Sequence, residues 1–135
     1  MIKHLHILFF LLLGCEPFAL SLEDIADDQP RFVADTLSEI EEGKAQLRVM
    51  AWNIKYGAKR MPFWFDCWGD QVSISSEQIK ENMSGLYEMI NEANPDILMV
   101  EEIELHSRRS AYYDMIQGIL NNTDLNYGAY YETWN

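Results

Sequence analysis

Two apolar runs of this chain each end in side chains that can bind a metal ion or a phosphate. Residues 47–52 read LRVMAW and are followed by Asn53, while residues 95–100 read PDILMV and are followed by Glu101 and Glu102. Both runs are predicted to be β-strands, and the second is predicted to be buried on both faces. Ligands of open α/β sheets collect outside the carboxyl ends of the strands. We therefore expect Asn53 and Glu102 to meet at one sheet edge if their strands are neighbours.

The chemistry that these side chains suit is metal-assisted hydrolysis of a phosphate ester. The carboxylate of Glu102 is a hard oxygen ligand of the kind that Mg²⁺ prefers. The amide of Asn53 can donate to a phosphate oxygen or offer its carbonyl to the metal. Simpler structural roles are the alternatives: Glu102 can pair with Arg108 or Arg109, and Asn53 can cap a turn. Glu101 alternates to the opposite side of an extended chain, which favours a group behind the ligand or a solvent-facing one.

The two motifs together resemble a known superfamily. VMAWNI at residues 49–54, followed by PDILMVEEI at residues 95–103, is similar to the start of the endonuclease/exonuclease/phosphatase superfamily. The resemblance covers residues 47–135 and implies the N-terminal portion of a four-layer αββα sandwich with bound Mg²⁺ or Mn²⁺. It matches Asn53 to the family's catalytic Asn and Glu102 to its metal-binding Glu. Glu101 departs from the pattern, because the family usually has Gln at that position.

The resemblance also implies residues that this chain lacks. The family's Asp-x-Asn pair, a further Asp and a late Ser-Asp-His motif belong to a second half, and His106 matches no family position. The hypothesis is therefore an N-terminal fragment of a metal-dependent phosphoesterase or phosphodiesterase, incomplete and inactive by itself. The alternative is a non-catalytic envelope binding module that keeps the fold. The substrate class stays open among nucleic acid, phospholipid headgroup and sugar phosphate, and no specific protein partner is predicted.

The first fifteen residues are predicted to be an export signal. Lys3 supplies the positive region, residues 7–13 supply an apolar one, and LLGC at residues 12–15 resembles a bacterial lipobox. In that type of signal Cys15 becomes the lipidated first residue of the mature protein. An ordinary signal peptide with an incidental cysteine is the alternative. We expect an exported protein of the bacterial cell envelope, held to the membrane through a lipid anchor at Cys15.

The charge of the chain is strongly negative and unevenly placed. The formal net charge is −12, which opposes a general electrostatic grip on nucleic acid. Residues 16–46 are acidic and contain Pro17 and Pro30, so they are predicted to be a tether, within which residues 32–40 have the pattern of a short amphipathic helix. The predicted organisation is a signal at 1–15, a tether at 16–46 and the folded part at 47–135.

Two amphipathic helices are predicted between the strands. Ser75 and Gln78 fit a capping box, and Pro95 predicts that this first helix ends near Asn94. Its apolar face is predicted to comprise Ile79, Met83, Leu86, Tyr87 and Ile90. A second helix is expected at about residues 110–120 and a third strand at 127–134. Parallel pairing with crossover helices is the expected topology. The aromatic loop at 61–70 is predicted to pack over the sheet, with contact to lipid as the alternative.

Overall fold

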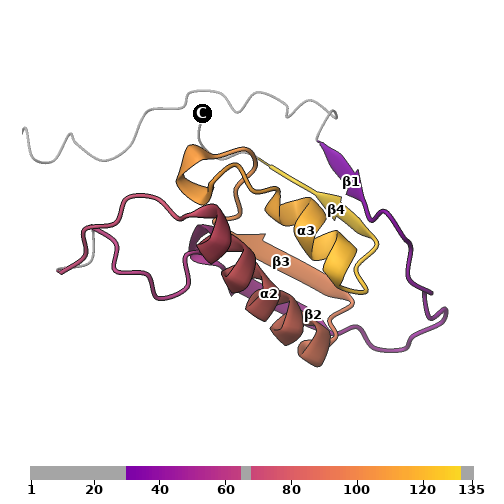
Figure 1. Ribbon diagram of the computed structural model, residues 1–135. Coiled ribbons are helices and arrows are strands. Elements are labelled where there is room, and N and C mark those ends of the chain that lie inside the picture. The colour runs from indigo at the N-terminus through magenta and orange to yellow at the C-terminus, as the bar shows by residue number, and fades with distance from the viewer. Residues whose placement is uncertain (1–29, 65–67, 132–135) are drawn as a thin grey trace, which may run out of the picture.

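The computed structural model describes residues 30–64 and 68–131 of the chain (Figure 1). Its elements follow in the order β1 (Arg31–Val33), β2 (Val49–Asn53), α2 (Ser76–Ala93), β3 (Ile97–Glu101), α3 (Met115–Asn122) and β4 (Tyr127–Ala129), with short 3-10 turns at Lys55–Gly57 and Arg108–Ser110. The architecture is mixed α/β, which confirms the predicted fold class at that level. No helix in this part of the chain is long and apolar enough to cross a membrane.

The two strands that carry the predicted site are neighbours. β2 and β3 pair in parallel, with Val49 opposite Ile97 at one end and Asn53 opposite Glu101 at the other. The connection between them contains α2, as expected for parallel strands joined by a crossover helix. The predicted parallel pairing is therefore confirmed for these two strands, and their carboxyl ends lie at one edge.

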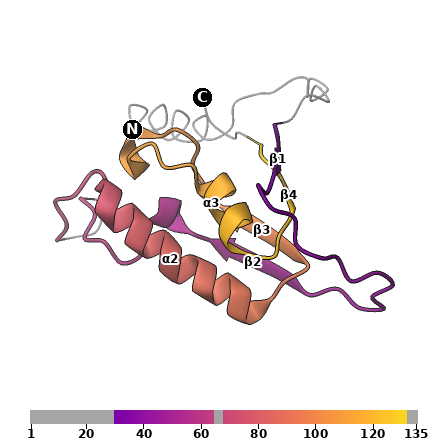
Figure 2. The ribbon, with the colours of Figure 1, turned by 45° about the vertical axis from the view of Figure 1, so that its right-hand side comes forward.

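The third predicted strand does not join this sheet. β4 pairs antiparallel with β1, with Arg31 opposite Ala129 and Val33 opposite Tyr127. Figure 2 shows this second pair set apart from β2 and β3. An apolar cavity of about 180 Å³ lies between them, lined by side chains of β3, α3 and β4. The expectation of a single parallel set of three strands was wrong, because β4 finds its partner in a segment that precedes β2.

The acidic stretch that was predicted to be a tether contributes to the fold. Residues 31–33 form β1, Ala34 is buried, and the Ala34 amide donates to the Asn126 carbonyl at 2.9 Å. The Asn126 side chain accepts from the Ser38 amide at 2.7 Å and donates to the Ser38 carbonyl at 2.9 Å. The structure thus differs from a tether over residues 31–38, and the short amphipathic helix expected at 32–40 was wrong. Residues 1–29 lie outside the described part of the chain.

Helix α2 forms as its sequence predicts. The Ser75 side chain accepts from the Gln78 amide, and the Gln78 side chain accepts from the Ser75 amide, which completes the capping box. The helix ends at Ala93 and is capped by Asn94, which adopts a left-handed conformation with φ 46° directly before Pro95. All members of the predicted apolar face are buried: Ile79, Met83, Leu86, Tyr87 and Ile90.

Helix α3 begins later than predicted. It starts at Met115 because the Asp114 side chain caps it, accepting from the Gln117 amide at 2.9 Å. The residues before it form a 3-10 turn at 108–110, and Ala111 and Tyr112 then have positive φ. The Tyr113 hydroxyl lies 2.9 Å from that of Tyr87, so this segment is joined to α2. Burial and this hydrogen bond raise the pKa of Tyr87 above its ordinary value.

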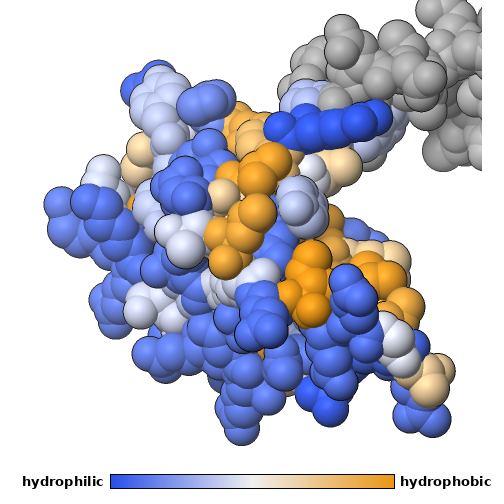
Figure 3. Space-filling view, turned by 90° about the vertical axis from the view of Figure 1, so that its right-hand side faces the viewer, coloured by the Kyte–Doolittle hydropathy of each residue, from blue (hydrophilic) through white to orange (hydrophobic). Residues whose placement is uncertain are grey.

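Only one face of the β2–β3 pair is covered in the described structure. Both helices lie on the same side (Figure 1), where Trp52, Leu98 and Val100 pack against the main hydrophobic cluster. On the other face Val49, Ile97 and Met99 are about half exposed, in an alternating pattern. The prediction that β3 is buried on both faces was therefore wrong for this chain. Figure 3 shows hydrophobic residues at the surface seen from the side of β1 and β4.

An ionic anchor fixes the amino ends of the two parallel strands. The Asp96 carboxylate accepts from the Arg48 amide at 2.7 Å and from Lys44 Nζ at 2.6 Å, and the Arg48 guanidinium donates to the Ala93 carbonyl at 2.6 Å. The Arg48 amide, and then Lys44, hold the pKa of Asp96 below its ordinary value. The anchor therefore joins the residues before β2 to the end of α2 and the start of β3.

This anchor predicts how stability depends on pH. Because the pKa of Asp96 is lower in the folded than in the unfolded chain, its carboxylate stabilises the fold at neutral pH. That contribution is lost as the pH falls from the ordinary Asp value through the lowered one. In urea unfolding from about pH 7 to about pH 3, the gap in midpoint between the wild type and Asp96→Asn should shrink. Glu92→Gln, an exposed change on α2, is the control; a gap for Asp96→Asn that does not change with pH would contradict this role.

Candidate functional site

The two predicted site residues meet at the carboxyl ends of β2 and β3. Asn53 Nδ2 donates to Glu102 Oε1 at 2.9 Å, and Asn53 Oδ1 accepts from the Lys55 amide at 2.9 Å. Both side chains are exposed. The second contact fixes the amide, so its nitrogen faces the carboxylate. The chain therefore brings together the pair that the strand-end pattern predicted.

The backbone around this pair is held in sparsely populated conformations. Lys55 has φ 47°, Tyr56 has φ 44° and Glu102 has φ 54°, all in the left-handed region and none of them glycine. Each such residue costs on the order of 1–3 kcal/mol and persists only when its surroundings hold it there. Two backbone hydrogen bonds do so, from the Tyr56 amide to the Glu102 carbonyl at 2.8 Å and from the Ile54 amide to the Glu101 carbonyl at 3.1 Å. The loop after β2 is thereby tied to the end of β3.

The buried side chain of Tyr56 fixes this loop through contacts with two other residues. The Tyr56 ring meets the Phe63 ring edge-on, with centroids 5.1 Å apart and planes at 74°. The Arg109 guanidinium lies 3.9 Å from the centre of the Tyr56 ring, within the range of a cation–π contact. Arg109 Nε also donates to Glu104 Oε1 at 2.8 Å, and the two side chains form an ion pair. Tyr56 is therefore held between Phe63 and a guanidinium that Glu104 orients.

Glu102 does not make the arginine pair that was its alternative interpretation. Arg109 is taken by Glu104, and no ion pair joins Glu102 to either arginine of the loop within residues 30–64 and 68–131. Glu102 Oε2 accepts no hydrogen bond from this part of the chain. The carboxylate is accordingly exposed, turned toward Asn53 and open on one oxygen.

Glu101 lies beside the pair without joining it. It is the last residue of β3 and faces Asn53 across the strand pair, and its side chain is exposed. No hydrogen bond or ion pair links the Glu101 side chain to another described residue. Simple strand alternation does not apply to its neighbour, because the positive φ of Glu102 turns the chain there. The role of Glu101 as a group behind the predicted metal ligand, Glu102, stays a prediction.

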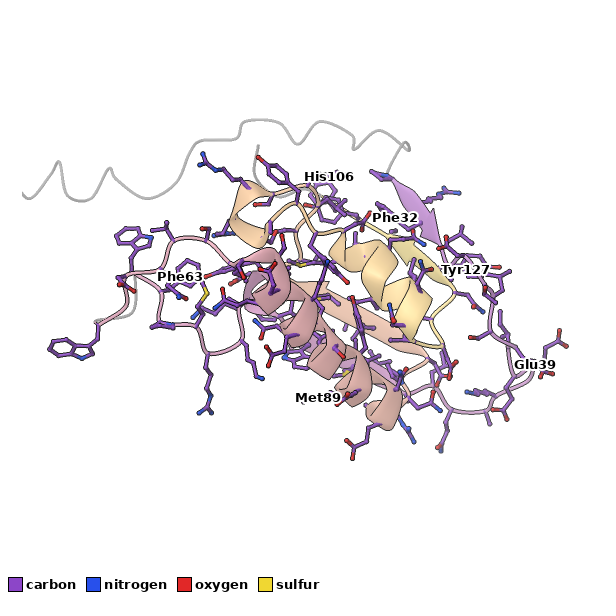
Figure 4. The ribbon with its side chains drawn as sticks, viewed as in Figure 1. Phe32, Glu39, Phe63, Met89, His106 and Tyr127 are labelled. Atoms are coloured by element: carbon purple, nitrogen blue, oxygen red, sulfur yellow. The ribbon has the colours of Figure 1, made fainter. Side chains whose placement is uncertain are left out.

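Other residues weighed for function have separate outcomes. His106, labelled in Figure 4, is exposed in the loop after β3. In the aromatic loop Met61 and Phe63 are buried, as predicted for packing, but Trp64 is 59% and Trp68 98% exposed. Cys15, the predicted lipidation site, lies outside the described residues. The packing prediction for this loop therefore holds for one part of it only.

Sequence reasoning missed the support around the site. Glu104 is 13% exposed, and its Oε2 is buried without a hydrogen-bond partner in the described structure. Its contact with Arg109, and that of Arg109 with Tyr56, depend on how the loop at 102–110 folds. Tyr56 is separated from Arg109 by more than fifty residues in the sequence. No periodicity or motif of the chain indicates that these three side chains meet.

The donor set suits a weakly held cation rather than a closed metal cage. No group of three or more His, Cys, Asp or Glu side chains that could hold a metal occurs among the described residues. One exposed carboxylate, that of Glu102, has an oxygen that accepts no hydrogen bond from the described residues. Mg²⁺ is commonly bound through only one or two carboxylates, with waters and substrate phosphate completing its shell. Glu102 fits that mode of binding.

Comparison with protein-family models, curated proteins and solved structures finds no match to this chain. The class that the structure itself defines is a mixed α/β protein with a parallel strand pair and an Asn–Glu pair at its carboxyl edge.

Proposed function

We propose that this chain is the N-terminal part of a metal-dependent phosphoesterase of the endonuclease/exonuclease/phosphatase type. The observation that carries the proposal is the 2.9 Å hydrogen bond between Asn53 and Glu102 at the carboxyl ends of two parallel strands. Ligands bind at this position in open α/β sheets. The strained backbone of Lys55, Tyr56 and Glu102 adds support, because such residues cluster at functional sites.

The proposed roles follow from the hydrogen bonds. Glu102 would hold Mg²⁺ or Mn²⁺ through its open oxygen, and the bound metal would offset negative charge on the phosphoryl group. Asn53 Oδ1 is occupied by the Lys55 amide, and one Nδ2 proton goes to Glu102. The second Nδ2 proton is then available to orient a phosphate oxygen. Asn53 is therefore a phosphate-orienting donor and not a metal ligand.

The four-layer sandwich is part of the proposal. The open face of the β2–β3 pair carries Val49, Ala51, Ile97 and Met99, while the other face packs against α2 and α3. Two sheets that pack face to face bury alternating apolar residues of this kind between them. The open face supports a fold in which a second sheet, not present among the described residues, would cover it. The Asp and His residues that complete the reaction would come from that second half.

The proposed location is the bacterial cell envelope. A lipid at Cys15 would anchor the exported chain to the membrane, as its lipobox-like segment implies. Because residues 31–33 form β1, a tether between the anchor and the fold would be shorter than the predicted 16–46. Globomycin treatment of expressing cells tests this: treatment should cause the unprocessed precursor of the wild type to accumulate, whereas Cys15→Ala should remain unprocessed with or without the drug.

The metal assignment is tested by titrating Mn²⁺ into the ¹⁵N-labelled full chain. We expect the paramagnetic ion to broaden the Asn53 side-chain amide signals, since Glu102 lies against that amide. Glu102→Gln keeps the shape of the side chain and removes its charge, and it should weaken Mn²⁺ binding about tenfold or more. Glu101→Gln is the matched control and should stay within about twofold of the wild type. A loss confined to Glu101→Gln would overturn the assignment, and no binding by any form would favour the non-catalytic module.

The proposal also predicts what the chain does not do alone. We expect no Mg²⁺-dependent turnover of a bis-aryl phosphodiester by the 135-residue chain, because the second half would supply the base. Turnover that Glu102→Ala abolishes would show that this chain is sufficient for the reaction.

A further inference from the structure

Three of the ten basic side chains in the sequence line one cavity beside the candidate site. Lys55, Lys59 and Arg60 border a cavity of about 700 Å³ that also includes Asn53, and no acidic side chain lines it. The net charge of the whole chain is −12. A cavity that collects cations in so acidic a chain focuses a local positive potential. This is the charge pattern of a site for an anion.

The rest of the lining is mostly apolar. Trp52 and Ile54 contribute from the end of β2, and Leu86 and Met89 contribute from α2. Met89, labelled in Figure 4, is 53% exposed, so this wall is open to an incoming ligand. The volume is typical of cavities that take a small organic molecule. The cavity therefore combines cations with an apolar wall.

The loop that carries the cations is fixed to α2. Asn82 Nδ2 donates to the Gly57 carbonyl at 2.8 Å, and the Ala58 amide donates to the Lys55 carbonyl at 2.8 Å. Ala58 is almost completely buried. These contacts hold the backbone before Lys59 in place, and the Met61 amide, which donates to the Ala58 carbonyl at 3.1 Å, holds the backbone after it. Lys59 and Arg60 therefore extend from a loop whose backbone is ordered.

Two of the three cations are not neutralised by the described protein. Lys59 and Arg60 form no ion pair with any residue of the part of the chain that the structure describes. Glu81 lines an adjoining cavity together with them and makes no such pair. A guanidinium next to an ammonium suits a doubly charged phosphate, since the guanidinium fork matches two phosphate oxygens.

We propose that this cavity binds a small organic phosphate. The phosphate lies against Lys59 and Arg60, and the organic group lies against Trp52, Leu86 and Met89. The inference deepens the proposed function and rests on it for the link to catalysis, because Asn53 borders the cavity. Binding itself needs no metal. The substrate class that follows is a phosphate ester with an aryl or alkyl group, and the cavity should prefer such an ester over inorganic phosphate.

The test is calorimetric titration of the full chain with phenyl phosphate in EDTA. We expect binding, and we expect Lys59→Gln combined with Arg60→Gln to weaken it about tenfold or more. Lys80→Gln removes one charge from the exposed surface of α2, away from the cavity lining, and should leave affinity within about twofold. Inorganic phosphate should bind more weakly than phenyl phosphate, and phenol should not bind.

Each other outcome overturns a stated part of the proposal. No binding of phenyl phosphate, or an equal loss in Lys80→Gln and the double variant, refutes the anion site. Equal affinity for inorganic and phenyl phosphate refutes the apolar wall. Because EDTA removes divalent metal, a failure here leaves the Mn²⁺ titration unaffected. A failed Mn²⁺ titration in turn leaves this measurement valid, so the two proposals fail separately.

Discussion

Replacing Met83 by alanine is expected to lower the free energy of unfolding by about 2–5 kcal/mol. Met83 is fully buried on α2, in the main hydrophobic cluster, where Met115 of α3 is also fully buried. Truncation removes the transfer free energy of the side chain and leaves a cavity that the neighbours fill only in part. Urea unfolding followed by circular dichroism measures the loss as a shift in midpoint.

Met89 provides the matched control on the same helix. It is 53% exposed, so Met89→Ala should change the free energy of unfolding by no more than about 0.5 kcal/mol. The two variants make the same chemical change six positions apart. Similar losses in both would show that Met83 is not packed in the main hydrophobic cluster.

The part of the fold that could be predicted from the sequence is the part that local interactions determine. In α2 the capping box joins residues three apart, and the buried face repeats at helical spacing, so a short window contains all the information. The parallel pairing of β2 and β3 also follows locally, because a helix between two apolar strands favours a crossover.

The β1–β4 pair could not be predicted for a physical reason. Each strand has three residues, and their pairing joins segments about a hundred residues apart. The contacts that hold the segment after β1 include hydrogen bonds made by side chains, two between Asn126 and the Ser38 backbone and one from Asn121 to Asp35. The acidic stretch at 16–46, which contains Pro17 and Pro30, has the composition of a linker. Partners far along the chain, among them β4 and the buried Asn126, make residues 31–38 part of the fold.

The candidate site likewise has a part that could be predicted from the sequence and a part that could not. Asn53 and Glu102 could be predicted because strand ends collect in space, a rule that depends on topology alone. The left-handed conformations of Lys55, Tyr56 and Glu102 could not be predicted, since none of these residue types favours them. They follow from hydrogen bonds between two loops that meet only when the sheet has formed. The cationic cavity depends on the same loop and was missed for the same reason.

Replacing Gly57 by alanine is expected to lower the free energy of unfolding by about 1–3 kcal/mol. Gly57 has φ +69°, a conformation that strains any residue with a side chain. An added Cβ would lie 2.5 Å from Ile79 Cδ1 and 3.3 Å from Met83 Sδ, so α2 must shift or Ile79 must change rotamer. Urea unfolding measures the loss.

Gly85→Ala is the control with the opposite sign, because Gly85 lies within α2 and an added Cβ would meet nothing within 4 Å. That change should raise the free energy of unfolding by about 0.5–1 kcal/mol, since alanine favours helix over glycine. The Gly57 carbonyl accepts from Asn82, and its turn begins at Lys55, whose amide holds Asn53. Strain at Gly57 should therefore also shift the Asn53 side-chain amide signals, which Gly85→Ala should leave in place. A Gly57→Ala variant that is as stable as the wild type and leaves the Asn53 signals unmoved would contradict this coupling. It would show that the turn at Lys55–Gly57 does not connect the hydrophobic core to Asn53.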